Sequence, residues 1–208
     1  MSSSLRIRWT IAPRIAPRPL INCNRCGDVK PYRCSEKFRV NANGRRIDAW
    51  LIYRCVACDN SWNFTILERR NRRDIEPALL AALESNEPAL ARRLAFDAAA
   101  LRDRTARIEE FVDVAIRKQI LGGNPEDAAA FWLELRLDAA TPLRLDRLLA
   151  AELGVSRSRL QGWEDKGRLT IEPDQAKALR KPVRDGMAVR VDLSGEADRD
   201  IIVASACR

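Results

Sequence analysis

Polar and hydrophobic residues alternate along much of the first third of the chain, which is the pattern of strands that bury one face. The alternation is clear on both sides of the Asn43-Gly44 dipeptide. Because Asn-Gly tolerates the positive φ angles of a tight turn, the pattern predicts a hairpin within a β-rich segment, 23–64. Residues 1–22 are interrupted by prolines and carry four arginines, so they predict an irregular basic arm.

The hydrophobic period changes twice further along the chain. Over residues 74–104 leucines recur at helical spacing, and two prolines stand where the first turn of a helix tolerates them, so we predict two or three short helices. Residues 111–138 return to alternation around a Gly-Gly-Asn-Pro sequence, which predicts a second hairpin. The alternative over residues 108–120 is a helix, because Ala, Arg and Lys favour one.

The last third of the chain predicts two helices followed by strands. Leucines from Leu145 to Leu153 mark one face of a helix that ends at Gly154. Ser156 is a typical N-cap for the second helix. A strand of Leu, Thr and Ile follows, and residues 183–191 predict a turn and a closing strand.

The cysteines carry the clearest chemical signal. Cys23-Asn-Arg-Cys26 and Cys55-Val-Ala-Cys58 form two C-x-x-C pairs separated by 28 residues, with the first predicted hairpin between them. Each pair offers two thiolates from one turn, and two pairs complete a tetrahedral site. The pattern predicts a zinc ribbon over residues 23–70, with one structural zinc ion and no open coordination position for catalysis.

Other chemistries for these cysteines fit less well. Disulfides are disfavoured in a reducing compartment, an iron–sulfur cluster fits the two-plus-two spacing less well than zinc, and a redox dithiol needs no second pair. Cys34 is an alternative ligand, but its place on a strand favours a core thiol, and Cys207 is expected to be free. Gly27 and Asp59 follow the two pairs and are expected to turn the chain.

The absence of histidine among the 208 residues argues against most catalytic functions. It removes the commonest general base, the Ser-His and Cys-His pairs, and every His-ligated metal site. Acidic residues of the middle segment show no spacing that defines a catalytic pair. They are Asp97, Asp103, Glu109, Glu110 and Asp113. We therefore expect no catalytic residues, and we rank an RNA-modifying enzyme below the binding functions.

The chain also lacks the signals of membrane insertion and secretion. No apolar run approaches the roughly 18–20 residues of a membrane span. The first twenty residues contain no uninterrupted apolar core of a signal peptide, so we expect a cytoplasmic protein.

Positive charge is concentrated near the N-terminus. The net charge of +8 divides into +11 for residues 1–73, −5 for 74–138 and +2 for 139–208. A basic surface attracts polyanions, chiefly nucleic acid or anionic lipid, although an arginine excess also serves solubility alone. The basic run 69–73 either binds phosphate or forms a solvated linker.

Aromatic and basic residues are interleaved around the predicted ribbon. They are Arg33, Phe38, Arg39, Arg45, Arg46, Trp50, Tyr53, Arg54, Trp62 and Phe64. Such residues bind nucleic acid through phosphate contacts and base stacking. The competing interpretation is that the aromatic side chains cover a small core.

The C-terminal region resembles a known family of RNA-binding domains. Four pieces carry the similarity: Leu143-Arg-Leu-Asp-Arg-Leu-Leu149, Leu153-Gly-Val-Ser-Arg-Ser-Arg-Leu160, Lys166-Gly-Arg-Leu169 and Lys181-Pro-Val-Arg-Asp-Gly186. They resemble the RNA-binding domain named after the fourth small-subunit ribosomal protein. The resemblance implies a small α/β domain over residues 139–193 whose basic helix edge faces RNA. The implied RNA contacts are Arg144, Arg157, Arg159, Lys166, Arg168 and Lys181.

The similarity has one gap. Residues 171–180 replace a tight Asn-Gly turn of the family, and acidic residues reduce the net charge over residues 144–190 to +4. This departure implies a weakened affinity for RNA.

The complete arrangement also resembles a family of uncharacterised bacterial proteins. We predict an α+β protein with an irregular arm (1–22), a zinc ribbon (23–70), helices plus a β-hairpin (74–138), the RNA-binding-type domain (139–193) and a tail (194–208). The leading hypothesis is a non-catalytic protein that binds structured RNA of the ribosomal or transfer RNA class. The alternative is a protein-interaction adaptor, whose binding would be insensitive to salt.

Overall fold

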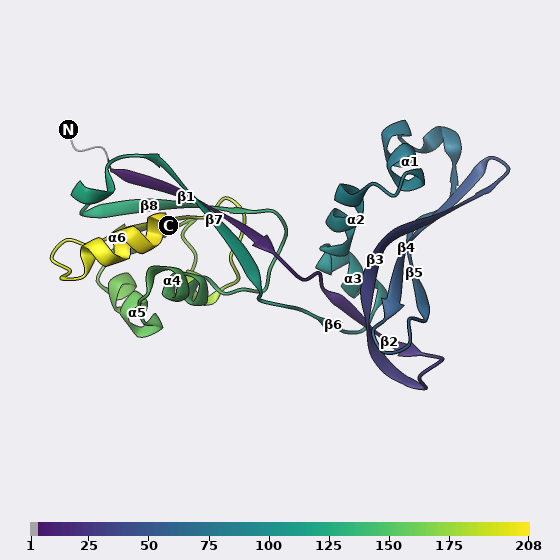
Figure 1. Cartoon of the computed structure of the whole chain (residues 1–208), viewed down its shortest axis with the longest axis horizontal. Coiled ribbons are helices and arrows are strands. Elements are labelled where there is room, and N and C mark those ends of the chain that lie inside the picture. Colours follow the sequence, from purple (N-terminus) through teal and green to yellow (C-terminus); the bar gives the residue numbers. More distant parts are fainter. Residues whose placement is uncertain (1–3) are drawn as a thin grey trace. The chain divides into compact units, whose positions relative to one another are not determined.

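The structure, a computed structural model, describes residues 4–208 and divides the chain into two compact units (Figure 1). Unit 2 is the continuous segment Ile15–Phe111. Unit 1 combines the N-terminal residues up to Arg14 with Val112–Arg208. Unit 2 is therefore inserted in sequence between two parts of unit 1. Each unit contains one five-stranded sheet, and the predicted α+β class is confirmed.

Unit 2 is built on an antiparallel sheet of strand order β5-β4-β3-β2-β6. The strands are β2 (Arg18–Cys23), β3 (Asp28–Asn43), β4 (Arg46–Cys55), β5 (Ser61–Asn71) and β6 (Ile108–Glu109). Gly44, with φ of +61°, lies in the turn between β3 and β4. The hairpin predicted around Asn43-Gly44 is confirmed, because β3 and β4 pair on either side of this turn. The turn needs a residue with a left-handed backbone, which glycine supplies without a steric cost.

Helices cover one face of this sheet. They are α1 (Pro77–Glu84), α2 (Pro88–Ala95) and α3 (Ala98–Arg104), preceded by a 3-10 helix at Arg72–Asp74. The predicted prolines begin α1 and α2, and the Glu87 carboxylate caps α2 by accepting from the amide of Leu90 at 2.8 Å. Leu83 and Leu101 pack with Leu51 of β4 in one core, so the prediction of two or three short helices is confirmed.

Unit 1 contains a mixed sheet of strand order β7-β1-β8-β10-β9. The strands are β1 (Leu5–Pro13), β7 (Val114–Gly122), β8 (Ala130–Leu137), β9 (Leu169–Glu172) and β10 (Ala188–Asp192). Strand β1 is antiparallel to β7 and parallel to β8.

The predicted irregular arm is wrong for most of its length. Residues 1–3 lie outside the described part of the chain, but β1 and β2 occupy much of the remainder. In β1 the side chains of Leu5, Ile7 and Trp9 are fully buried and alternate with polar residues. The alternation was present in the sequence, but the arginines and prolines around it obscured a strand that finds both partners far along the chain.

The hairpin predicted over residues 111–138 is also wrong in its pairing. Both strands exist as β7 and β8, joined by a connection that contains a 3-10 helix at Pro125–Asp127. They do not pair with each other, because β1 lies between them and bonds to both. Adjacent strands usually pair, but the N-terminal strand fills the position here.

Helices α4 (Leu145–Leu153), α5 (Arg157–Asp165) and α6 (Arg199–Cys207), with a 3-10 helix at Ala178–Arg180, complete unit 1. Gly154 ends α4 at φ of +68°, and the Ser156 hydroxyl accepts from the amide of Arg159, as predicted. None of the helices in residues 4–208 is long and apolar enough to cross a membrane.

The predicted boundaries at residues 139 and 194 do not separate compact units. Strand β10 bonds to β8, so the segment 139–193 shares one sheet with β1. The predicted tail forms α6, where Ile202 and Val203 are buried in the unit 1 core. The Trp9 indole donates to the Ala206 carbonyl at 2.8 Å and ties α6 to β1.

Candidate functional site

The four predicted cysteine ligands converge at one end of the unit 2 sheet. Their sulfur atoms all lie within 4.8 Å of one another. The Sγ atoms of Cys23 and Cys58 are 3.5 Å apart, and those of Cys26 and Cys55 are 4.0 Å apart. All six cysteines of the chain are free thiols. The cluster is therefore a group of soft donors that can hold a metal ion.

Two similar turns create this arrangement. Cys23 ends β2 and Cys55 ends β4, and the second cysteine of each pair lies in the following turn. The carbonyls of Cys23 and Cys55 accept hydrogen bonds from the amides of Gly27 and Asp59, at 2.8 and 3.0 Å. Gly27 and Asp59 both have left-handed backbones, with φ of +73° and +57°. This confirms that these residues turn the chain after each pair.

Neighbouring polar groups act on the thiols. The Asn60 amide lies 3.8 Å from the Cys23 sulfur, and the Tyr32 hydroxyl lowers the pKa of Cys23 to about 5. Hydrogen bonding to the Cys58 thiol raises the pKa of Cys26 to about 12. Thiols in this mutual contact cannot all ionise unless a cation compensates their charge. The donor set and its crowding therefore fit a bound metal ion.

The other two cysteines lie outside the cluster. The Cys34 sulfur accepts from the amide of Glu36 at 3.3 Å, and burial raises the pKa of Cys34 to about 11. Cys207 lies in α6 and packs against the unit 1 core, where burial raises the pKa of its thiol.

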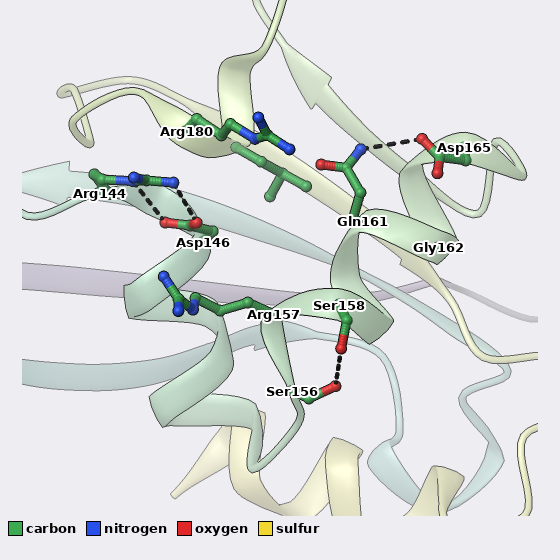
Figure 2. A pocket seen from close by; sticks show the side chains of 10 residues that line it. Arg144, Asp146, Ser156, Arg157, Ser158, Gln161, Gly162, Asp165 and Arg180 are labelled. Carbon is green, nitrogen blue, oxygen red and sulfur yellow. Dashed lines mark hydrogen bonds and ion pairs between the residues drawn. The ribbon is translucent and has the colours of Figure 1, made fainter.

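A second candidate site is an open pocket in unit 1, with a volume of about 820 Å³. It lies beside α5 and the 3-10 helix Ala178–Arg180 (Figure 2). Its lining residues are Arg144, Asp146, Ser156, Arg157, Ser158, Gln161, Gly162, Asp165, Leu179 and Arg180. We call it the basic pocket, because its three arginines outnumber its two aspartates.

The three arginines differ in their partners. Arg144 forms a two-pronged ion pair with Asp146, with N–O distances of 3.1 and 2.6 Å (Figure 2). Arg157 and Arg180 form no ion pair with a described residue. The hydroxyls of Ser156 and Ser158 lie 3.0 Å apart at the start of α5. The pocket thus offers two unpaired guanidinium groups, two hydroxyls and a helix N-terminus.

The structure places only two of the six implied RNA contacts, Arg144 and Arg157, at this pocket. Lys166 ends α5, and the Lys181 ammonium donates to the Gln175 side chain at 3.3 Å. Neither lysine lines the pocket, whereas Arg180, which the resemblance did not imply, does. The sequence interpretation missed it because it lies in the segment without a counterpart in the resembled family.

Arg159 and Arg168 have other partners. Arg159 pairs with Glu196 and with Asp198, the latter at 2.6 Å, and its guanidinium lies 5.0 Å from the centre of the Trp163 ring. Arg168 pairs with Glu196 at 2.5 Å. Hydrogen bonds to Asp198 and then to Glu196 raise the pKa of Arg159, and the hydrogen bond from Arg159 is the main cause of the lowered pKa of Glu196. The two arginines hold the connection before α6 against α5.

Together, the fold and the cysteine cluster define a two-unit α+β protein with a candidate metal-binding site. A family model described as "Protein of unknown function (DUF1062)" matches residues 40–175, more than half of the chain. The chain belongs to this family. No curated protein and no solved structure matches it.

Proposed function

We propose that this chain is a non-catalytic RNA-binding protein that holds one structural zinc ion. In this proposal it contacts structured RNA, of the ribosomal or transfer RNA class, through the basic pocket of unit 1.

The sulfur geometry supports zinc as the metal. Four thiolates at about 2.3 Å from a tetrahedral zinc ion lie about 3.8 Å from one another. The two sulfur pairs at 3.5 and 4.0 Å bracket that spacing. A cluster of several irons needs additional room for iron and sulfide between the thiolates. Because four protein thiolates fill the coordination sphere, the zinc would stabilise unit 2 and take no part in chemistry.

The observation that carries the RNA proposal is that one pocket is lined by Arg157, at the start of α5, and by Arg180, of the 3-10 helix Ala178–Arg180, neither with a carboxylate partner among the described residues. Phosphate groups bind at such places, because guanidinium charge, hydroxyl donors and the positive end of the helix dipole act together. Ser156 and Ser158 supply the hydroxyls. Phosphate contacts of this kind provide most of the affinity of a protein for nucleic acid.

The order of elements gives additional support. Two helices, α4 and α5, precede the antiparallel strands β9 and β10. We take this to be the helical part of the RNA-binding domain named after the fourth small-subunit ribosomal protein, with the Ser-Arg-Ser-Arg segment at its RNA-facing edge. Its strands are shared with the larger sheet of unit 1.

Titration of transfer RNA into the zinc-loaded protein at several salt concentrations tests the proposal. We expect one zinc ion per chain and an affinity that falls steeply with salt. In the Arg157→Ala/Arg180→Ala variant, the slope of log affinity against log salt should decrease by about 1.8, which corresponds to two phosphate contacts.

A matched variant controls for the loss of charge. Arg117 and Arg136 are exposed on β7 and β8, outside the pocket. Arg117→Ala/Arg136→Ala should leave the slope unchanged. Zinc binding without any salt-dependent RNA affinity would contradict the RNA proposal and indicate a protein-interaction adaptor.

A further inference from the structure

The β3–β4–β5 part of the unit 2 sheet has two faces with different surroundings. Helices α1, α2 and α3 pack against one face through a core that contains Phe38, Leu51 and Phe64 (Figure 1). Side chains alternate between the faces of a strand, so the neighbours of these residues point to the other face. Within unit 2, none of the helices packs on that side. We call it the open face.

Strand register places a distinctive group of residues side by side on the open face. Trp50 of β4 is paired with Arg39 of β3 and with Thr65 of β5. The further residues of this face include Asn41, Arg46, Asp48, Ile52, Arg54 and Asn63. Arginine, asparagine and threonine side chains, together with Asp48 and Ile52 of the same strand, thus surround one tryptophan.

Trp50 differs from the other aromatic residues of the sheet. Tyr53 and Phe64 are buried on the helix side, and Trp62 contacts both of their rings. Trp50 is partly exposed, and the Arg39 guanidinium lies 5.9 Å from the centre of its ring. The mixed set of aromatic residues in the sequence therefore divides into core residues and one surface tryptophan with an arginine beside it.

Basic residues predominate on the open face, which carries Arg33, Arg39, Arg46 and Arg54; the Asp48 carboxylate of this face accepts from the Arg69 amide at 2.7 Å. Among the described residues only Arg33, of its four arginines, has a carboxylate partner, Asp59 at 2.8 Å. Arg46 donates to the Arg69 carbonyl, and Arg54 donates to the Asp59 carbonyl and the Ser61 hydroxyl.

More arginines lie at the edge of this face. The Arg72 amide donates to the Arg45 carbonyl at 2.9 Å, which brings the basic run 69–73 next to the β3–β4 turn. These arginines are exposed and extend the positive surface beyond the sheet.

We propose that the open face binds single-stranded RNA, with Trp50 stacking on a base and with Arg39 and Arg46 contacting phosphates. An aromatic ring on a sheet, flanked by cations and amides, suits unpaired bases, which expose a ring face that a duplex hides. The positive charge complements the phosphate backbone. This inference rests on the proposed function in that the ligand is RNA, but it assigns single strands to unit 2, separately from the basic pocket.

Fluorescence anisotropy of a labelled oligouridine of about ten nucleotides, a length suited to one such face, tests the inference on the full-length, zinc-loaded protein. We expect Trp50→Ala to weaken binding by about tenfold or more, and Trp50→Phe, which keeps a stacking ring, to retain most of the affinity. Arg39→Ala/Arg46→Ala should decrease the salt slope by about 1.4.

The control removes the same charge from the helix side of unit 2. Arg93 and Arg104 are exposed on α2 and α3, and Arg93→Ala/Arg104→Ala should leave oligouridine affinity within about twofold. Zinc content and circular dichroism establish that each variant is folded.

Parallel titrations with transfer RNA separate the two proposals. If Trp50→Ala binds oligouridine like the wild type, the inference is wrong, even if Arg157→Ala/Arg180→Ala loses transfer RNA. If Trp50→Ala weakens oligouridine binding while the pocket variant leaves transfer RNA binding unchanged, the open face is supported and the basic pocket is not.

Discussion

Arg159 illustrates how its neighbours decide the role of a single side chain. The Ser-Arg-Ser-Arg segment predicted an RNA contact at this position. In the structure Arg159 is bonded to Glu196 and Asp198 and lies over Trp163. The two carboxylates lie more than thirty positions away in the sequence, so no local pattern could reveal them. Arg157, two residues earlier, lines the pocket and has no ion-pair partner among residues 4–208.

The Glu196 carboxylate makes unit 1 sensitive to acid. Its pKa is lowered chiefly by the hydrogen bond from Arg159. A carboxyl with a lowered folded-state pKa stabilises the fold above its unfolded pKa, about 4.3, and this stabilisation is lost as pH falls through the folded-state pKa. We expect Glu196→Gln to lower the free energy of unfolding by about 1–2 kcal/mol near neutral pH. The difference from the wild type should shrink below about pH 4.

Urea titrations of both proteins across this pH range measure the difference. Asp200→Asn is the control. The Asp200 side chain is 82% exposed, so its ion pair with Arg199 should contribute little to the free energy of unfolding at any pH. A Glu196→Gln difference that stays constant down to low pH would contradict the assignment.

At the scale of elements, the position of β1 organises unit 1. It lies between β7 and β8, and its buried residues Leu5, Ile7, Trp9 and Ile11 face the core. The turn after β7 returns past the start of β1. There Gly123 has φ of +85°, and a Cβ atom at this residue would lie 2.6 Å from the Leu5 Cα.

We expect Gly123→Ala to destabilise unit 1 by at least about 2 kcal/mol, because the left-handed backbone and the backbone contact both oppose a side chain. Gly122 is the matched control, since a Cβ there meets nothing within 4 Å and its φ is not positive. Gly122→Ala should change the melting temperature by no more than a degree or so, roughly the range of neutral surface changes. Equal effects of the two substitutions would show that β1 does not restrict this turn.

At the scale of the whole molecule, the insertion of Ile15–Phe111 into unit 1 determines which pieces can fold alone. Unit 2 is continuous and has its own core and its own cysteine cluster. The segment 139–193 does not have this independence, because β10 needs β8, and β8 in turn bonds to β1.

We therefore expect an isolated 15–111 fragment to fold with one zinc ion and to lose its structure when a chelator removes the metal. An isolated 139–193 fragment should remain unfolded. Circular dichroism and metal analysis measure both outcomes. In the 15–111 fragment Cys55→Ser should abolish metal binding, whereas Cys34→Ser should keep full zinc content, since Cys34 lies outside the cluster. A folded, metal-free 15–111 fragment would refute a structural role for zinc.

Local signals were sufficient for much of this protein. The turn at Asn43-Gly44, the prolines that begin α1 and α2, and the Ser156 cap are decided by nearby backbone conformation and hydrogen bonds, and all three are present as predicted. The two C-x-x-C pairs are also determined locally, because each pair is a short turn that needs only its own residues.

Long-range pairing decided the rest. Strand β1 separates β7 from β8, Glu196 forms an ion pair with Arg159, and strand register leaves Trp50 on the open face of its sheet. Each of these outcomes depends on which distant segments meet, and a hydrophobic period along one segment does not specify its partner. Many of the helices and strands could therefore be predicted from the sequence, though not β1, β2 or α6. Which segments lie next to one another, and which side chains stay exposed as a result, was decided only by the tertiary structure.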